Sequence, residues 1–180
     1  MSRLTIPTRD QAPAASKPML DAVGKQLGVI PNLFRLVGLS PAALEGYVAL
    51  NGALSKTLDA KTRERIALTI AQANSCDYCL SAHTYLGLNL AKLDEGELRR
   101  NRQGHSGDAK AEAALVFARR VAETHGQVSD ADLAAVKSAG YTEAQVIEIV
   151  ANVALNVLTN FINNVAHTEI DFPVVRAKAA

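Results

Sequence analysis

The segment RERIALTIAQANSCDYCLSAHTYLG, residues 63–87, joins two helical patterns through a short polar break. Before the break, apolar residues recur at helical spacing from Ile66 to Ala73. Asn74 and Ser75 then interrupt the first helix and suit the start of a second one. The segment therefore predicts two consecutive helices, the second of which carries the only two cysteines of the chain.

The remaining sequence is also typical of helices. Residues that favour helix starts recur along the chain, at Ser40 before Pro41, Asp59, Asp94 with Glu97, Asp108, Ser129, and Thr142 with Gln145. No stretch alternates apolar and polar residues for long enough to indicate a strand. We predict an all-α fold, a bundle in which the cysteine-bearing helix packs against the helix before it.

A chain of 180 residues suits a single domain. Residues 1–17 contain Pro7 and Pro13 and are predicted to form an extended N-terminal arm. Residues 18–180 are predicted to form one all-helical domain.

Charge and hydropathy exclude several classes of function. The formal net charge is +1 and the Lys and Arg residues are not clustered, which argues against binding to nucleic acid or to an anionic membrane. The N-terminal region lacks the apolar core of a secretory signal, and no window resembles a membrane-spanning segment. We therefore expect a cytoplasmic protein.

The two cysteines are only three residues apart, a spacing typical of reactive or metal-binding pairs. In a reducing compartment a permanent disulfide is rare, so their spacing favours catalysis, redox sensing or metal binding. Cys76 and Cys79 fall near the start of a helix, where free N–H groups favour a thiolate. His83 lies four residues after Cys79 on the same helical face and can take the thiol proton or deliver one.

Glu64 is a candidate general acid or base. It lies twelve residues before Cys76, near the start of the preceding helix. In a tight helical hairpin it would approach the thiols directly or through water, and an apolar pocket would raise its proton affinity. An exposed ion pair with Arg63 or Lys61 is the alternative, and spacing alone does not choose between them.

Two other interpretations of the cysteines stay open. Cys76, Cys79 and His83 are zinc-ligand types, but a closed site needs a fourth ligand, and Glu64 would have to serve. Alternatively, the cysteines pack as inert apolar residues. We favour reactive thiols and predict no metal.

The last helical pattern carries a row of asparagines beside an apolar stripe of Val146, Ile149, Val150, Val153, Val157, Phe161 and Val165. Asn152, Asn156, Asn160 and Asn164 recur at four-residue intervals. Such a row lines a subunit contact, bonds to a packed helix, or faces solvent, and a solvated face is the commonest of these arrangements.

Residues 63–87 resemble the active-site segment of the alkylhydroperoxidase D (AhpD-like) and carboxymuconolactone decarboxylase family, with its glutamate, CxxC pair and following histidine. The flanking sequences LGVIPNLFRLVGLSPAALEGY, residues 27–47, and NFINNVAHTEIDFP, residues 160–173, resemble the peroxidase-related branch. The resemblance implies an all-helical fold that assembles as homotrimers or homohexamers.

By this resemblance, Cys79 is the peroxidatic thiol and Cys76 the resolving one, while Glu64 and His83 form a proton relay. The implied activity is that of a thiol-dependent peroxidase, a disulfide oxidoreductase with antioxidant activity that reduces alkyl hydroperoxides. The implied partners are a hydroperoxide and an external dithiol reductant or adaptor protein. No cofactor is expected beyond the redox-active pair.

The sequence departs from the family pattern at Tyr78, where the best-studied hydroperoxidases have a histidine. A phenol ionises near pH 10, so Tyr78 is at most an auxiliary hydrogen-bond donor. The decarboxylase branch lacks the cysteine pair, so a decarboxylase-like enzyme is a less favoured alternative. A second alternative is a non-catalytic oligomer of the same fold that binds metal or senses redox state.

Overall fold

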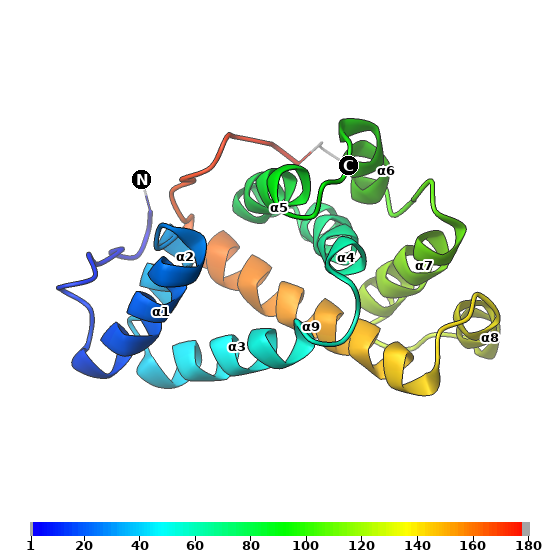
Figure 1. The fold of residues 1–180 in the computed structure, drawn as a ribbon, viewed down its shortest axis with the longest axis horizontal. Helices are drawn as coiled ribbons and strands as arrows, with labels where there is room; N and C mark the ends of the chain where they lie inside the picture. Colours follow the sequence, from blue (N-terminus) through cyan, green and yellow to red (C-terminus); the bar gives the residue numbers. More distant parts are fainter. Residues whose placement is uncertain (1, 178–180) are drawn as a thin grey trace.

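The computed structural model describes residues 2–177, which form helices and contain no strand (Figure 1). The all-α prediction is therefore confirmed. A 3-10 turn at Ala14–Ser16 precedes α1 Lys17–Leu27, α2 Asn32–Val37, α3 Pro41–Leu54, α4 Ala60–Ala73, α5 Asp77–Asn89, α6 Glu95–Arg102, α7 Ala109–Glu123, α8 Asp130–Ser138 and α9 Glu143–Ala166.

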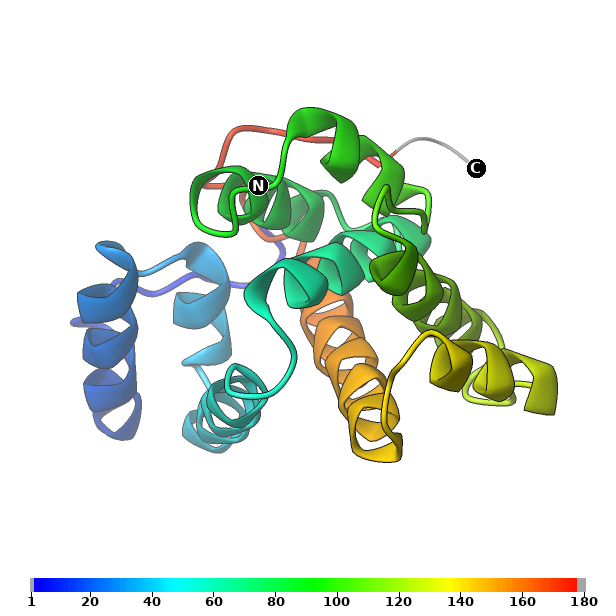
Figure 2. The same ribbon diagram turned by 45° about the vertical axis from the view of Figure 1, so that its right-hand side comes forward.

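Helix α4 is the centre of the fold, and α5, α6, α7 and α9 all pack against it (Figures 1 and 2). On one side, Leu68 joins a core shared with α5 and the N-terminal helices. On the other side, Ile66 and Ile70 join a second core with α7, α8 and α9. These three side chains are fully buried. The apolar spacing of α4 therefore places this helix, and the residues before and after its end, in the interior.

The predicted helix starts are confirmed at most positions. Ser40, Asp59, Asp108, Ser129 and Thr142 each accept a hydrogen bond from the N–H group three residues later. This pairing satisfies one of the N–H groups that a helix start leaves without a partner.

Two helix starts differ from expectation. Asn74 ends α4 rather than capping α5, and Ser75 adopts a positive φ of 50° that turns the chain, so Cys76 itself caps α5. At α6, Asp94 caps as predicted. Glu97, however, does not close a capping box, because its carboxylate binds Arg65 and other side chains instead.

Helix α9 is rotated relative to the sequence prediction. Val146, Ile149 and Val153 are buried as expected, but Phe161 is 55% exposed and Val165 65% exposed. The inward face of the C-terminal half is polar, with Asn152, Asn156, Asn160 and Asn163 all buried. The asparagine row is therefore not a solvated face. It stays buried because the amides of Asn152 and Asn156 bond to backbone carbonyls of their own helix.

The two chain ends lie along the same side of the bundle. In the N-terminal arm, Arg3 donates its N–H to the carbonyl of Ala166. The arm is shorter than predicted, because residues 14–16 already form a turn. The segment after α9 crosses over α5 (Figure 2), where Val175 and Ser81 exchange hydrogen bonds. This C-terminal strap, residues 168–177, covers the start of α5.

One helix among the described residues, α9, is long and apolar enough to cross a membrane by length and composition. Its mean hydropathy over the relevant window is 1.5, yet its asparagine face packs inside the protein. A buried core helix passes the same test. The cytoplasmic location stays a prediction.

Candidate active site

The hairpin of α4 and α5 brings Glu64 to His83. Glu64 lies in the second turn of α4 and His83 in the second turn of α5, and only a short link separates the two helices. The Oε2 atom of Glu64 lies 2.8 Å from Nδ1 of His83, and both side chains are about one-fifth exposed. The glutamate is therefore paired with the histidine rather than with a neighbouring cation.

The cysteines occupy the buried start of α5. Both are free thiols with almost no exposed surface. The backbone N–H of Cys79 donates to the sulfur of Cys76 over 3.3 Å, which is the capping bond of the helix. The two thiol side chains are also close enough to form a hydrogen bond with each other. The structure thus places Cys76 and Cys79 together.

The two thiols differ in acidity. Burial would raise the pKa of Cys79, but the hydrogen bond from Cys76, the charge of His83 and the amides of Asn163 and Asn160 lower it to about 7. The hydrogen bond with Cys79 and burial raise the pKa of Cys76 far above its usual range. The expected lowering of a thiol pKa is therefore found for Cys79 and not for Cys76, and its causes are neighbouring side chains.

His83 is poised to carry a positive charge. Burial would lower the pKa of the imidazole, but the carboxylate of Glu64 and the nearby Cys79 sulfur raise it overall. A glutamate on one side and a thiolate on the other therefore both favour the imidazolium. Such a group can supply a proton to a leaving oxygen.

Asn163 is a site residue that the sequence reasoning missed. Its Nδ2 atom donates to the sulfur of Cys79 over 3.3 Å, from a helix 84 residues away in the chain. The neighbouring Asn160 also lowers the pKa of Cys79. The signal that points to them is the asparagine row itself, because a buried row of amides requires polar partners.

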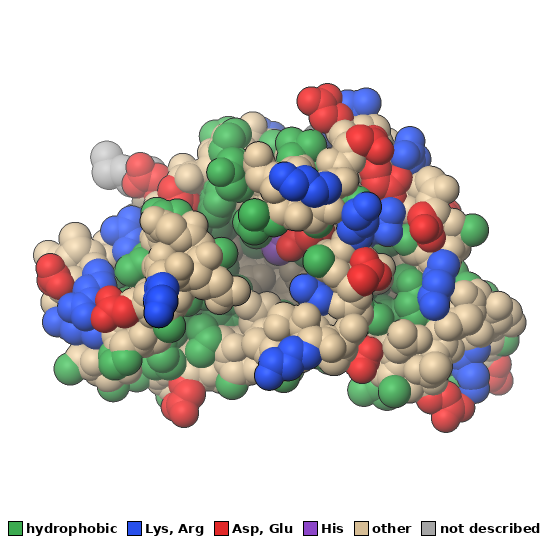
Figure 3. Space-filling view, viewed as in Figure 1, with side chains coloured by type: hydrophobic (Ala, Val, Ile, Leu, Met, Phe, Trp, Pro, Cys, Tyr) green, Lys and Arg blue, Asp and Glu red, His purple; other side chains and the backbone are tan. Residues whose placement is uncertain are grey.

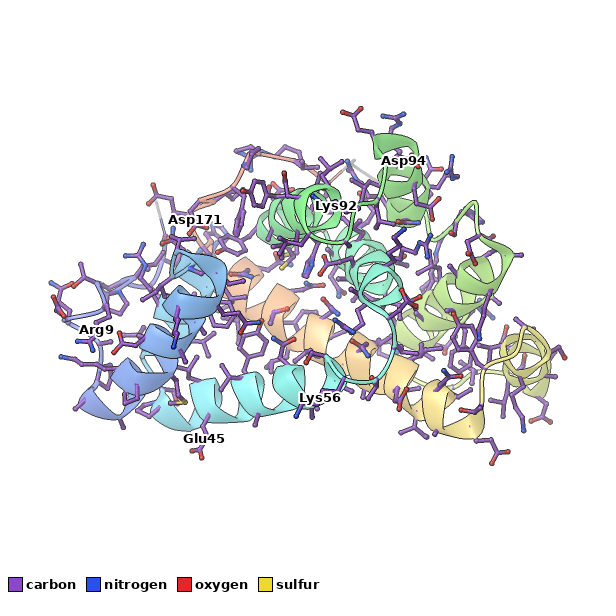
Figure 4. All side chains as sticks on the ribbon, viewed as in Figure 1. Arg9, Glu45, Lys56, Lys92, Asp94 and Asp171 are labelled. Atoms are coloured by element: carbon purple, nitrogen blue, oxygen red, sulfur yellow. The ribbon has the colours of Figure 1, made fainter. Side chains whose placement is uncertain are left out.

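Tyr78 has a different position from the one its place in the motif implies. Its hydroxyl accepts the N–H of Leu33 at 3.0 Å and donates to Asp171 at 2.8 Å. Asp171 lies beside α2 in Figure 4, and its other oxygen accepts the N–H of Asn32 at the start of that helix. Burial raises the pKa of Tyr78 well above its usual range. Tyr78 therefore joins α5 to α2 and to the C-terminal strap, and its hydroxyl stays protonated at neutral pH.

A small cavity of about 90 Å³ connects the reactive groups. Cys79, His83 and Glu64 form one part of its lining, and Asn156 and Thr159 of α9 form another. Figure 3 shows a hollow between α3 and α5 on this face, with histidine surface at its edge. A small substrate in this cavity reaches the Cys79 sulfur and the His83 ring together.

The zinc interpretation requires four ligands close together. Within residues 2–177, no group of three or more His, Cys, Asp or Glu side chains is arranged to hold a metal ion. The carboxylate of Glu64, which would have been the fourth ligand, is engaged with His83. The absence of a metal stays a prediction.

Comparison with known proteins finds a family match over part of the chain. The sequence model of the carboxymuconolactone decarboxylase family matches residues 41–124, which include Glu64, Cys76, Cys79 and His83. An uncharacterized protein of Haemophilus influenzae is 49% identical over 45 residues. That match spans 24% of this chain and 40% of the relative, so it is local.

Solved structures match over nearly the full length. A peroxidase-related protein from Ralstonia eutropha, described as an alkylhydroperoxidase AhpD core, has a TM-score of 0.84 and 24% identity, covering 94% of this chain and 92% of its own. A peroxidase-related protein from Silicibacter has a TM-score of 0.81 and 21% identity, covering 93% and 91%. The debrominase Bmp8, in complex with 2,3,4-tribromopyrrole, has a TM-score of 0.76 and 20% identity, covering 95% and 94%.

At these identities the structural matches establish the fold, and the family match covers the segment that carries Glu64, Cys76, Cys79 and His83. The architecture of the matched structures also agrees with the predicted bundle, in which the cysteine-bearing helix packs on the helix before it. Residues 41–124 of this chain are thus similar to the carboxymuconolactone decarboxylase family, and the chain has the AhpD-like helical fold.

Proposed function

We propose that this protein is a thiol-dependent peroxidase that reduces small hydroperoxides through Cys79 and Cys76. The observation that supports this most is the environment of Cys79, whose pKa is lowered to about 7. A thiol with that pKa is about half ionised at neutral pH, and the thiolate is the nucleophilic form. Inert buried cysteines have raised pKa values instead.

In the first step of the proposed reaction, the Cys79 thiolate attacks one oxygen of the hydroperoxide. A sulfur–oxygen bond forms, the O–O bond breaks, and the second oxygen leaves as an alkoxide. The His83 imidazolium, held by Glu64, gives its proton to that alkoxide. The products are an alcohol and a sulfenic acid on Cys79.

In the second step, the sulfur of Cys76 attacks the sulfenic sulfur of Cys79. A disulfide forms, and the hydroxyl leaves as water with the proton of Cys76, carried through the now neutral His83. Because Cys76 already bonds to Cys79, this step needs little movement. An external dithiol or adaptor protein then reduces the disulfide.

The cavity size supports a small substrate. Its volume of about 90 Å³ corresponds to about three water molecules. Hydrogen peroxide or a short alkyl hydroperoxide fits such a space, whereas a fatty acid hydroperoxide does not. We therefore expect the rate constant for the first step to fall as the alkyl group grows.

The experiment is peroxide consumption by the reduced protein and two variants. Cys79→Ser should abolish consumption, since it removes the nucleophile. Cys76→Ser should allow one turnover and leave a sulfenic acid on Cys79 that dimedone traps. If both variants consume peroxide at the wild-type rate, the thiol mechanism is wrong.

The family contains other chemistries, and the same variants separate them. Debromination is assayed with 2,3,4-tribromopyrrole, because the debrominase Bmp8 shares the fold. Decarboxylation is assayed with a muconolactone-like acid, because the family is named for that reaction. Activity of either kind that survives Cys79→Ser would place the function outside thiol chemistry.

A further inference from the structure

Beyond the substrate cavity, the structure has two larger pockets beside the cysteine pair, and neither contains the groups that would reduce a peroxide. The first, of about 410 Å³, lies under the C-terminal strap against the start of α5. The second, of about 560 Å³, lies between α4, α6 and α7. Both pockets are lined by Ser75, so they adjoin at the residue directly before Cys76.

The first pocket adjoins the residues on either side of Cys76 and does not include the proton relay. Its lining includes Ser75, Asp77 and Asn163, but neither Glu64 nor His83. Asn163 is the residue whose Nδ2 atom donates a hydrogen bond to the Cys79 sulfur. Asn163 therefore both lines the first pocket and contacts the Cys79 sulfur.

Two polar side chains of the first pocket lack hydrogen-bond partners. The Oδ1 atom of Asn163 and the hydroxyl of Thr168 are buried and unpaired, in residues that are 2% and 6% exposed. Buried oxygens without partners are rare in folded proteins. Both oxygens can accept a hydrogen bond from an N–H or S–H group of a ligand in this pocket.

The second pocket is positively charged. Arg99, Arg102 and Arg119 line it, with Glu123 as the acidic lining residue. Arg119 pairs with Glu123, but the hydrogen bonds of Arg102 go to neutral oxygens, the amide of Gln72 and the carbonyl of Arg176. Its charge is therefore available to an anion that approaches from solvent.

The strap joins the two pockets. Arg176 lines the first pocket, while its carbonyl accepts from Arg102 of the second. The strap is held to the start of α5 by Asp77, which binds Arg176 and the N–H of Ala177. Because Cys76 is fully buried beneath this region, a ligand reaches it when these exposed contacts open.

The difference in pKa between the two cysteines determines which sulfur of the disulfide a reductant attacks. In a disulfide, the sulfur with the lower pKa is the better leaving group. Cys79 has that role, because His83 and Asn163 stabilise its charge, whereas the hydrogen bond with Cys79 and burial raise the pKa of Cys76 despite the backbone N–H that it accepts. A reducing thiolate therefore attacks Cys76, whose two chain neighbours, Ser75 and Asp77, line the first pocket.

We propose that the reductant of the Cys76–Cys79 disulfide is a small anionic thiol compound that enters through these two pockets. Its negative group binds at Arg102 and Arg119, and its sulfur attacks Cys76 from beneath the strap. The attack forms a mixed disulfide on Cys76 and releases Cys79 as a thiolate. A second thiol then attacks the mixed disulfide, releasing reduced Cys76 and the oxidised reductant. This inference rests on the proposed function, because it requires a disulfide in the cycle.

The test measures reduction of a preformed disulfide. Diamide oxidises the pair without peroxide, and the reduction rate is then followed with 3-mercaptopropionate and with its neutral amide, each corrected for its thiolate fraction. The carboxylate should react about tenfold faster at low salt, and salt should shrink that preference. Equal corrected rates would overturn the inference.

Variants of the pocket arginines test where the anionic group of the reductant binds. Arg119→Gln and Arg102→Gln should each reduce the preference for the carboxylate severalfold, while Arg120→Gln, an exposed arginine outside both pockets, should retain it. A looser strap would speed both reagents equally. The ratio of their two reduction rates is therefore unaffected by a change in access. A ratio that neither pocket variant changes would contradict this assignment.

Two further readouts identify the sulfur and the source of the charge. Rapid alkylation and peptide mapping should find the mixed disulfide on Cys76 and the alkyl group on Cys79, and the reverse pattern would overturn the proposed direction of attack. Glutathione and coenzyme A then distinguish a carboxylate from a phosphate as the preferred anion. A pair that diamide cannot oxidise would overturn the proposed function and this inference with it, whereas a disulfide that forms but shows no charge preference would overturn the inference alone.

Discussion

Asn163 on α9 donates its side-chain N–H to the sulfur of Cys79 on α5 over 3.3 Å. Both residues are buried, so the hydrogen bond is shielded from water. A hydrogen bond to a charged acceptor strengthens when that acceptor ionises. Asn163 therefore acts on the thiolate form of Cys79 and stabilises it relative to the thiol.

Replacing Asn163 should raise the pKa of Cys79. In Asn163→Leu the amide donor is lost while side-chain volume is kept, and we expect the pKa to rise by about one unit, since a bond to a charged group contributes about 1.5 kcal/mol. The rate of iodoacetamide alkylation as a function of pH measures this value. In the wild type, alkylation should rise with pH through about 7. Asn89→Leu, at an exposed position of α5, is the control, and an unchanged midpoint in Asn163→Leu would exclude the role.

Replacing Glu64 should weaken proton delivery. In Glu64→Gln the carboxylate charge that raises the pKa of His83 is lost, so less imidazolium is present at neutral pH. Peroxide consumption should fall by about a hundredfold, the usual contribution of general acid catalysis. The pKa of Cys79 should also rise, because the imidazolium charge stabilises its thiolate.

The protein contains a matched control for that variant. His105 and Glu112 form a second histidine–glutamate pair at 2.7 Å, on the surface near the start of α7. Glu112→Gln should leave both peroxide consumption and thiol alkylation unchanged. If both glutamine variants lose activity equally, the effect of Glu64 is not specific to the site.

The hairpin that carries the site could be predicted because its signals are local. Asp59 caps α4 through the N–H of Thr62, three residues away. The Glu64–His83 contact then follows from two helices joined by a short link. Cys76 as the cap of α5 was missed because it depends on the left-handed conformation of Ser75, which a non-glycine residue seldom adopts.

The orientation of α9 could not be predicted from its periodicity. Its asparagines and its apolar residues both recur at helical spacing, so either face satisfies the pattern. The inward face is set by distant partners, the sulfur of Cys79 for Asn163 and the side chain of Asn74 for Asn160. Contacts across more than 80 residues leave no local signal in the chain.

Tyr78→Phe should affect stability more than chemistry. Without the hydroxyl, the N–H of Leu33 and the carboxylate of Asp171 each lose a partner. The cost of such losses is about 1–3 kcal/mol in the free energy of unfolding. Urea unfolding followed by circular dichroism measures it. Thiol alkylation at Cys79 should be unchanged, and a large shift of its midpoint would instead assign Tyr78 a part in the reaction.

Glu97 should make stability depend on pH. Burial would raise the pKa of this carboxyl, but hydrogen bonds from Ser106, Asn101, the N–H of Gly107 and Arg100 lower it from 4.5 to about 2. Because the folded-state pKa is the lower one, this stabilisation is complete above about pH 4.5 and is lost as pH falls toward about 2.

Glu97→Gln should therefore lower the free energy of unfolding at neutral pH by about 3 kcal/mol, in line with that shift. The difference from the wild type should shrink as the pH falls below 4.5. Urea titrations at several pH values measure both effects. Glu95→Gln, at an exposed position of the same helix, is the control. A difference that is constant across this range would show that packing, rather than charge, explains the loss.

The outward face of α9 predicts self-association. Its exposed residues form an apolar stripe: Ile147, Val150, Leu158, Phe161 and Val165. Exposed apolar stripes of this extent are typical of subunit contacts. This stripe faces away from both cores of the protein, so we expect a homo-oligomer, and the family resemblance implies a trimer or hexamer.

Phe161→Glu should dissociate that assembly. A buried carboxylate without a partner costs several kcal/mol, which weakens association by more than about a hundredfold. Sedimentation velocity over a range of protein concentrations measures the species present. Leu133→Glu, which replaces an exposed leucine on α8, should sediment like the wild type. A wild-type protein that sediments as a monomer throughout, or a Phe161→Glu variant that stays assembled, would show that the stripe is not the interface. Because Phe161 lies on the face opposite Asn160 and Asn163, thiol alkylation at Cys79 in the dissociated variant should keep its midpoint near pH 7.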